Sequence, residues 1–218
     1  MSLALERLSF AYEGGPIILD DASLVIEQGT YCLVRGPSGA GKSTLLRLLC
    51  LLEEPQSGHV VINGTATDAM VPAQLRRNVA YVQQMPTLLP GTVRENLLLP
   101  FSFKSNEGLL QPTDEVLLSY LSSFLLDCIT LETRADTLSV GQSQRVCLIR
   151  SLLLEPEVIL MDEPTASLDA DSARVVLDKA AELAASGMTV IMISHSEVTP
   201  PGVTHTIRIN AGKLEYAS

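Results

Sequence analysis

A short apolar run followed by a glycine-rich octapeptide is the feature that most restricts how this chain can fold. Residues 31–34 read Tyr-Cys-Leu-Val, and residues 36–43 read Gly-Pro-Ser-Gly-Ala-Gly-Lys-Ser. The apolar run predicts a buried strand, and the pattern after it predicts a helix that starts within residues 39–41 and continues to Leu52. Glycines let the backbone curl so that successive N–H groups point inward at the start of the helix, which makes a nest for an anion. The spacing therefore predicts a strand–loop–helix unit that binds phosphate.

The side chains of this loop also suit a nucleoside triphosphate. We expect Lys42 to reach the β- and γ-phosphates and Ser43 to ligate Mg²⁺. The nucleotide-binding residues predicted from the loop are Gly36, Pro37, Ser38, Gly39, Ala40, Gly41, Lys42, Ser43 and Thr44. An ordinary glycine-rich turn between a strand and a helix is the alternative. The apolar strand before the loop and the helical pattern after it favour the phosphate loop.

A second apolar run ends in two carboxylates. Residues 158–161 read Val-Ile-Leu-Met, and Asp162 and Glu163 follow them. Adjacent carboxylates at the end of a buried strand need a reason, because unpaired buried charge is costly. At the carboxyl edge of a sheet, where α/β proteins bind ligands, Asp162 is predicted to hold Mg²⁺ through water, and Glu163 to polarise an attacking water. The alternative is a strand that simply ends in a solvated turn. The presence of the phosphate loop favours the catalytic interpretation over this alternative.

Apolar strands alternate with helical patterns along most of the chain, which predicts an α/β fold with a mostly parallel sheet flanked by helices. Short strands separated by turns at the N-terminus predict an additional antiparallel β part. Helical patterns at Thr92–Leu99 and Thr113–Leu126 predict an inserted helical lobe. We therefore expect an ATP-binding α/β core at residues 1–84 and 142–218, with the lobe at residues 85–141.

Charge and composition exclude several classes of function. The net charge of −10 argues against a sequence-independent grip on nucleic acid and against electrostatic attachment to an anionic membrane. The four cysteines form no C-x-x-C pair, and three of them lie in apolar surroundings, so we expect small buried thiols instead of a zinc site. The N-terminus lacks the pattern of a secretory signal, and the longest apolar stretch, Leu45–Leu52, is interrupted by Arg47. We expect a cytoplasmic protein, with any membrane span supplied by another chain.

A pentapeptide between the two motifs resembles the signature of a known family. Residues 138–142 read Leu-Ser-Val-Gly-Gln, which is similar to the L-S-G-G-Q motif that defines ABC ATPases. Further motifs of that family follow its order: an aromatic residue at Tyr12, a glutamine at Gln84, Ser-Leu-Asp at 167–169 and Ser-His at 194–195. The resemblance covers nearly the whole chain and implies a P-loop NTPase fold of the ABC type.

The resemblance implies a role for each of these residues. Tyr12 would stack on adenine, and His195 would act beside Glu163 in catalysis. Gln84 would serve both the catalytic water and the Mg²⁺ ion. The residues implied to contact nucleotide at the signature and the following loop are Ser139, Gly141, Gln142 and Asp169.

Each of these residues also has a structural interpretation. Tyr12 is alternatively a half-exposed strand aromatic, and His195 a satisfied core histidine. Gln84 competes with its neighbour Gln83, and we choose Gln84 because it immediately precedes the loop. Asp169 is alternatively the N-cap of the next helix, a role compatible with a contact across a dimer.

The signature adds a second helix N-terminus suited to phosphate, with no nucleotide of its own. Across a two-fold axis it could face the nucleotide of another protomer, and the family works as such a head-to-tail homodimer with two ATP molecules between the subunits. The resemblance thus implies ATP and Mg²⁺, a second ATPase subunit and an integral membrane permease. Val140 replaces the usual first glycine of the signature pair, which adds a stiff side chain and leaves the backbone donor in place.

Transport is the function we expect, on the inner face of the cell membrane through the permease. A soluble ABC-type mechanoenzyme is one alternative, although the coiled-coil or zinc-bearing insertions of such proteins are missing. A nucleotide-binding regulator without hydrolysis is another, and it conflicts with Glu163. Residues 84–101 look most like the FetA-type ATPases, which implies export of iron or another metal ion.

Overall fold

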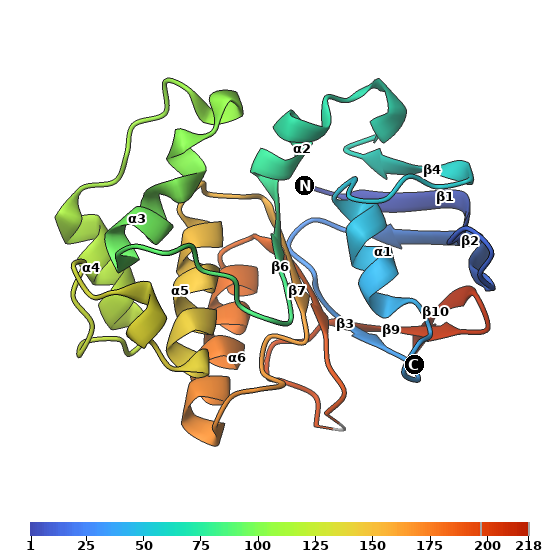
Figure 1. The fold of residues 1–218 in the computed structure, drawn as a ribbon. Coiled ribbons are helices and arrows are strands. Elements are labelled where there is room, and N and C mark those ends of the chain that lie inside the picture. The colour runs from blue at the N-terminus through green and yellow to red at the C-terminus, as the bar shows by residue number, and fades with distance from the viewer. Residues whose placement is uncertain (197, 218) are drawn as a thin grey trace.

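The computed structural model describes residues 1–196 and 198–217, whose strands form two sheets (Figure 1). The smaller sheet is antiparallel, with the strand order β2-β1-β4-β5. Its strands are β1 (Leu3–Ala11), β2 (Ile17–Ile26), β4 (Ser57–Ile62) and β5 (Thr65–Ala66). This sheet is the antiparallel part that the N-terminal turns predict.

The larger sheet has the order β10-β9-β3-β8-β7-β6 and is parallel except for its last pair, β9 with β10. Its strands are β3 (Tyr31–Arg35), β6 (Val79–Val82), β7 (Val158–Asp162), β8 (Thr189–Ile193), β9 (His205–Asn210) and β10 (Lys213–Ala217). Every residue of β7 and β8 is buried. Such continuous burial is expected of central parallel strands that are covered on both faces.

The helices are α1 (Lys42–Leu49), α2 (Pro72–Asn78), α3 (Val93–Leu98), α4 (Asp114–Ser123), α5 (Val140–Leu152) and α6 (Ala170–Ala185). Short 3₁₀ turns occur at η1 (Thr67–Ala69), η2 (Leu99–Ser102), η3 (Lys104–Asn106) and η4 (Ala135–Thr137). In the described ranges 1–196 and 198–217, no helix combines the length and the apolar character needed to cross a membrane.

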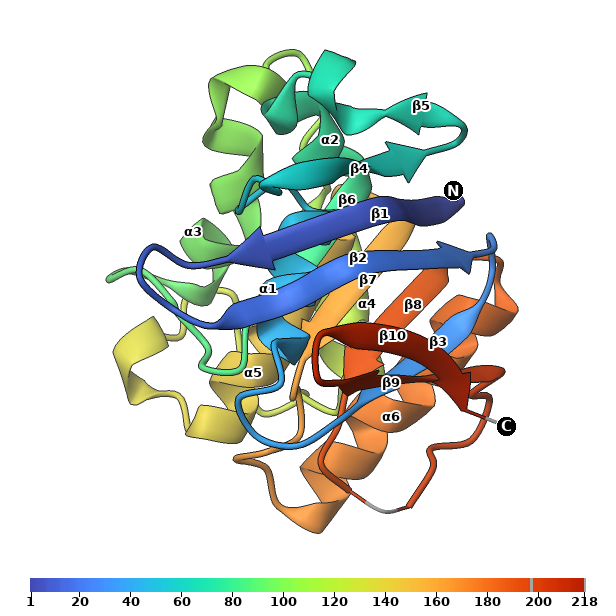
Figure 2. The same cartoon turned by 90° about the vertical axis from the view of Figure 1, so that its right-hand side faces the viewer.

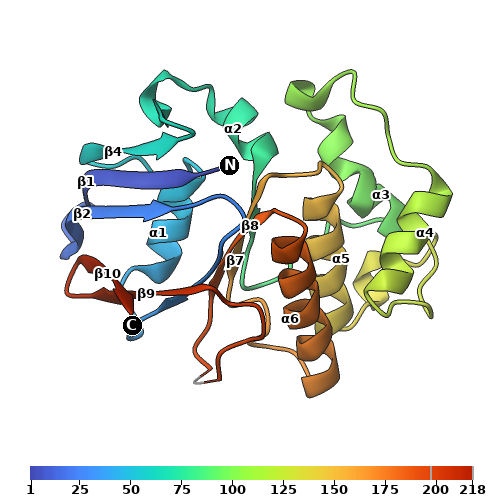
Figure 3. The ribbon, with the colours of Figure 1, turned by 180° about the vertical axis from the view of Figure 1, so that it is seen from behind.

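The larger sheet separates two apolar cores because successive side chains of a strand point to opposite faces. In β3, Cys32 and Val34 join one core, whereas Tyr31 and Leu33 join the other. The first core also contains α1 and the antiparallel sheet, so α1 lies between the two sheets (Figure 2). The second contains α3, α4, α5 and α6, with α5 and α6 side by side on that face (Figure 3). Strand alternation thus assigns α1 and α5 to opposite faces.

Capping residues fix where two of these helices begin. Thr92 and Glu95 form a reciprocal capping box at the start of α3. Asp169 accepts a hydrogen bond from the backbone of Ser172 at 2.9 Å, so it is the N-cap of α6. The pattern of the sequence therefore predicts these starts well, since capping depends on residues within one turn.

Three local expectations need correction. The helix predicted at Thr113–Leu126 ends at Ser123, because Leu125 adopts a left-handed conformation with φ 53°. The helix after the glycine-rich loop ends at Leu49 and not at Leu52, because Leu51 adopts a left-handed conformation with φ 54°. Helix α2 was not predicted. It is short and buries only Leu75, so it carries no apolar periodicity.

The division of the chain into a core and a lobe stays a prediction. Helices α3 and α4 lie in the segment expected to form the lobe, and they share an apolar core with α5 and α6. Helix α5 begins at Val140 and so crosses the expected boundary between residues 141 and 142.

Candidate functional site

The predicted nucleotide site lies where four parallel strands end. Strands β3, β8, β7 and β6 are neighbours in the sheet, so their carboxyl ends share one edge. The glycine-rich loop follows β3, His195 follows β8, Glu163 follows β7 and Gln84 follows β6. The carboxyl edge of a parallel sheet is the usual binding position in α/β proteins. The strand order therefore brings together residues that are up to 159 positions apart between Gly36 and His195 (195 − 36).

Glycine is required where the loop enters α1. Gly41 is the N-cap of the helix and has φ 92°, a conformation that side chains disfavour. A Cβ atom at this position would lie 2.1 Å from Ile18 Cγ2, because β2 passes close to the loop. The sequence pattern of the loop is thus enforced both by the backbone and by the neighbouring strand.

The lysine of the loop is held beneath it. Lys42 is only 6% exposed, and its Nζ donates hydrogen bonds to the carbonyl oxygens of Gly36 and Pro37, each at 3.0 Å. These two acceptors compensate for burial of the ammonium, which would otherwise be costly. The positive charge therefore lies directly under the backbone that is predicted to cradle phosphate.

Both oxygens of Asp162 have partners. Ser43 Oγ donates to Asp162 Oδ1 at 3.0 Å, and Tyr81 Oη donates to Asp162 Oδ2 at 2.9 Å. Burial, together with the adjacent carboxylate, raises the pKa of Tyr81 to about 12, so its hydroxyl remains a donor at neutral pH. The carboxylate is held beside the serine hydroxyl at the start of α1.

A hydroxyl and a carboxylate are hard oxygen ligands of the kind that Mg²⁺ prefers. Ser43 and Asp162 fit the ion, which usually keeps water and phosphate oxygens in the rest of its coordination shell. Within residues 1–196 and 198–217 there is no cluster of three or more His, Cys, Asp or Glu side chains suited to a metal. A site built from one carboxylate, one hydroxyl and a nucleotide agrees with that finding.

Glu163 is held by both neighbouring strand ends. Gln84 Nε2 donates to Glu163 Oε2 at 3.0 Å, and His195 Nε2 lies 2.7 Å from Glu163 Oε1. The Glu163 side chain is 17% exposed, and its backbone has φ 48°, a left-handed conformation that is uncommon for glutamate. Gln84 thus contacts the predicted base, Glu163. The hydrogen bonds of Ser43 and Asp162, the predicted Mg²⁺ ligands, do not involve Gln84. Gln83 instead offers its backbone carbonyl to Gln144.

These groups border a cavity of about 320 Å³ at the start of α1. Its lining contains half of the predicted residues together with one that was not predicted, Ile18: Tyr12, Ile18, Ser38, Gly39, Gly41, Lys42, Ser43, Thr44, Glu163 and His195. Tyr12 is 39% exposed at its rim, and its hydroxyl donates to Glu53 Oε1 at 3.2 Å. Phe10 packs edge-to-face with this ring, with the ring centroids 4.9 Å apart.

The signature residues form a second group outside this cavity. Ser139 and Gln142 make a reciprocal capping box at the start of α5, with hydrogen bonds of 3.2 and 2.9 Å. A Cβ atom on Gly141 would lie 3.4 Å from Ser172 Oγ, so the start of α5 adjoins the first turn of α6, which Asp169 caps. The structure thus brings the predicted residues together in two groups.

Comparison with known proteins agrees with this arrangement. The family described as "ABC transporter" matches residues 19–166, which is more than half of the chain.

The chain belongs to the ABC transporter family.

Several ABC relatives match nearly the whole chain. The arginine transport ATP-binding protein ArtP of Haemophilus influenzae is 36% identical, with 98% of this chain and 90% of that protein covered. The probable iron export ATP-binding protein FetA of Escherichia coli is 31% identical, with 94% and 90% covered. An ABC-type transporter of Mycosarcoma maydis is 34% identical over 97% of this chain, which spans only 16% of that protein's length.

The fold agrees with that of solved ABC proteins. A dimeric ATP-binding cassette in a post-hydrolysis state with ADP and phosphate has a TM-score of 0.87 and 27% identity, with 99% of this chain and 98% of that one covered. The ATP-binding subunit of an ABC transporter has a TM-score of 0.86 and 27% identity, with 100% and 90% covered. The ABC fold expected from the sequence is confirmed.

Sequence reasoning missed two residues of this ABC site, Ile18 and Tyr81. Nothing in the sequence near Ile18 indicates that β2 reaches the glycine-rich loop. Tyr81 does carry a signal, since a tyrosine within a buried strand normally finds a partner for its hydroxyl.

Proposed function

We propose that the chain is the ATP-hydrolysing subunit of an ABC transporter and couples closure of an ATPase dimer to the movement of a substrate through a separate permease. The observation that supports this most directly is the cavity at the start of α1, where Lys42 and Ser43 meet Glu163 and His195. A phosphate cradle next to a held carboxylate has the groups needed to bind a triphosphate and to activate water against it.

In this proposal, the N–H groups of the loop and the Lys42 ammonium bind the β- and γ-phosphates. Ser43 and Asp162 hold Mg²⁺, which neutralises charge on the phosphate oxygens. Glu163 accepts a hydrogen bond from the attacking water and aligns it with the γ-phosphorus. His195 and Gln84 keep the two oxygens of Glu163 in place, so the base does not have to be ordered during the reaction.

The site is completed by a second copy of the chain. The loop that binds phosphate precedes α1 on one face of the parallel sheet, whereas the signature begins α5 on the other. The N-termini of α1 and α5, the two helix ends proposed to bind phosphate, therefore belong to opposite faces of the parallel sheet. A head-to-tail pair of chains places Ser139, Gly141 and Gln142 of one opposite the cavity of the other, with Asp169 nearby. Each dimer would then hold two ATP molecules, with Tyr12 against adenine.

The permease is proposed to dock at the junction of the core and the lobe. After Gln84 the chain carries apolar side chains into solvent, with Met85 64% exposed and Leu89 49% exposed, whereas Leu88 packs against the second core. An exposed apolar patch commonly marks an interface.

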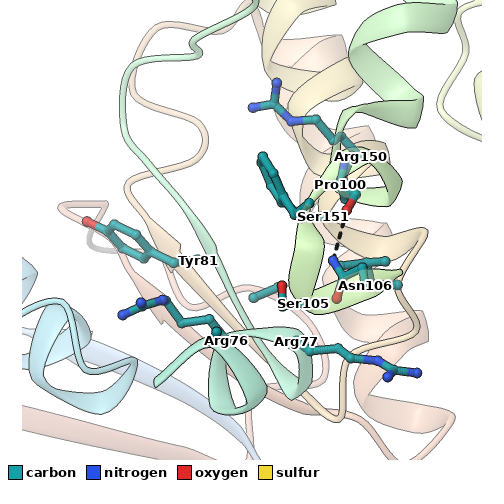
Figure 4. A pocket seen from close by; sticks show the side chains of 12 residues that line it. Arg76, Arg77, Tyr81, Pro100, Ser105, Asn106, Arg150 and Ser151 are labelled. Atoms are coloured by element: carbon teal, nitrogen blue, oxygen red, sulfur yellow. Dashed lines mark hydrogen bonds between the residues drawn. The ribbon is translucent and has the colours of Figure 1, made fainter. Parts of the chain in front are cut away.

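A cavity of about 420 Å³ (Figure 4) shares Arg150 and Ser151 with the smaller pocket that Met85 lines. Arg76, Arg77 and Arg150 line the larger cavity, and its described lining includes no carboxylate, in a chain whose net charge is −10. We refer to it below as the arginine-lined cavity. A cytoplasmic segment of the permease that carries both apolar and acidic side chains fits this surface. The chain would then act at the inner face of the cell membrane, attached through the permease.

Replacing both Met85 and Leu89 with glutamate is expected to weaken the permease complex about a hundredfold or more, because burial of each apolar side chain contributes ~1.5–3 kcal/mol. ATP turnover of the isolated subunit should not change. Co-purification with the permease and permease-stimulated phosphate release measure the two effects. Val25→Glu is the matched control, since Val25 is 59% exposed on β2, outside this surface. Full stimulation by the permease in the double variant would contradict the docking proposal.

We propose iron or another metal ion as the transported substrate. Support comes from the resemblance of residues 84–101 to FetA-type ATPases and from 31% identity to FetA. Inside-out vesicles that contain the chain and its permease should accumulate Fe²⁺ when ATP is added. The same vesicles provide the opposing test, because ATP-dependent movement of arginine without movement of Fe²⁺ would assign the chain to the transport class of ArtP.

A further inference from the structure

Tyr81 takes part in two regions of the molecule at once. It lies on β6 and lines the arginine-lined cavity together with Arg76 and Arg150 (Figure 4). Its hydroxyl donates a hydrogen bond of 2.9 Å to Asp162 Oδ2 at the end of the neighbouring strand β7. One side chain therefore connects the junction of core and lobe with the nucleotide site.

The hydrogen bond from Tyr81 fixes the orientation of the Asp162 carboxylate. Asp162 is 5% exposed, so little water is available to replace a lost partner. Ser43 binds Oδ1 and Tyr81 binds Oδ2, so rotation of the carboxylate breaks both hydrogen bonds. If the tyrosine hydroxyl is removed, Asp162 Oδ2 loses this donor and Ser43 holds only Oδ1. The carboxylate can then rotate about the Cβ–Cγ bond.

Tyr81 also lies close to a residue of α1. The Arg47 side chain on α1 lies near the hydroxyls of Tyr12 and Tyr81, and both neighbours raise the pKa of Arg47. Tyr81 thus lies beside α1, the helix that begins with Lys42 and Ser43. Hydrogen bonds join Tyr81, Asp162 and Ser43 in one group, which links the cavity wall with the start of α1.

We propose that Tyr81 is a positioning residue that holds Asp162 in the orientation needed for Mg²⁺, and that a segment docked in the arginine-lined cavity acts on the metal site through it. The inference rests on the proposed function as an ATPase and adds to it a residue that transmits docking. Groups that orient a metal ligand typically change metal affinity by ~10–100-fold when they are removed. A docked segment that contacts the Tyr81 ring shifts the hydroxyl and so alters the same affinity.

The first test measures how much Mg²⁺ strengthens binding of an ATP analogue whose β–γ bridge is an imido group. Calorimetric titrations of the wild type and of Tyr81→Phe are made once with Mg²⁺ and once with EDTA. The ratio of the two affinities is the gain in analogue affinity from Mg²⁺. We expect unchanged affinity in EDTA and a gain from Mg²⁺ that falls about tenfold in Tyr81→Phe. Tyr31→Phe is the matched control, because Tyr31 is a buried strand tyrosine whose hydroxyl contacts Met192 Sδ at 3.6 Å, and it should keep the full gain.

The outcomes separate this inference from the proposed function. A wild-type protein that binds no analogue in either condition refutes the proposed function. A wild type that binds the analogue but gains nothing from Mg²⁺, or a Tyr81→Phe variant that keeps the full gain, refutes the inference alone. Loss of affinity in EDTA by Tyr81→Phe would also overturn it, since the residue would then support the fold of the whole site.

The second test uses reciprocity, because coupling between two sites acts equally in both directions. The chain contains no tryptophan, and Phe103 lines the cavity with 52% of its surface exposed. The single tryptophan of a Phe103→Trp variant should change its emission when Mg²⁺ is added to the analogue complex. The change should vanish when Tyr81→Phe is added. An equal change with and without Tyr81→Phe, or no change in either protein, would refute transmission through Tyr81.

Discussion

Glu163→Gln is expected to lower ATP turnover by ~10²–10⁴-fold while nucleotide affinity is retained, because loss of a positioned base commonly has an effect of that size. Glutamine keeps the shape of the side chain, and it lacks the charge that polarises water. Gln84 and His195 contact the Glu163 side chain and hold it in position, and neither residue is altered in this variant. Phosphate release and analogue binding, measured on the same preparation, separate the two quantities. Turnover close to that of the wild type would remove Glu163 from the catalytic role.

The same variant should reveal the dimer. ATP that is not hydrolysed remains between the two subunits, and a ligand bound only by the closed dimer stabilises it by mass action. Light scattering should show mainly monomer without nucleotide, dimer with ATP and no dimer with ADP. Adding Ser139→Arg introduces bulk and charge at the start of α5 and should abolish the dimer. An ATP-dependent dimer that survives Ser139→Arg would exclude the shared site.

Lys42→Ala is the second change with a large expected effect. The buried ammonium is the positive charge beneath the phosphate cradle, and hydrogen bonds to charged groups contribute ~1.5–3 kcal/mol each. Nucleotide affinity should therefore fall roughly 10–100-fold. Turnover should fall by a further ~10²–10³-fold, because the charge also stabilises the transition state. Lys104→Ala, at an exposed lysine on η3, should leave both quantities unchanged. Undiminished hydrolysis by Lys42→Ala would refute the assignment of the loop.

Local chemistry explains what could be predicted from the sequence. The strand, loop and helix around residues 31–49 depend on glycine conformation and on apolar periodicity within a few residues. The starts of α3 and α6 depend on capping side chains within one turn. In contrast, the end of α1 depends on the left-handed backbone of Leu51, which the apolar pattern does not indicate. Helix α2 buries too few apolar side chains to be recognised from its sequence.

Contacts between distant segments could not be predicted in the same way. The residues at the ends of β3, β8, β7 and β6 meet because these strands are neighbours, and that order is a property of the tertiary fold. Pairing of β6 with β7 also places Tyr81 beside Asp162, although 81 positions separate the two residues. The family resemblance indicated that a histidine and a glutamine belong to the site, and the position immediately before the loop indicated Gln84 over Gln83.

The capping box at the start of α5 has a consequence for the speed of assembly. Ser139 and Gln142 already bind each other's backbone in the single chain, so the surface offered to a second copy exists before contact. Preformed surfaces lose little conformational entropy on association. Encounter of two such chains should therefore be limited by their mutual orientation, at roughly 10⁵–10⁷ M⁻¹s⁻¹, with no slow ordering step before the subunits join.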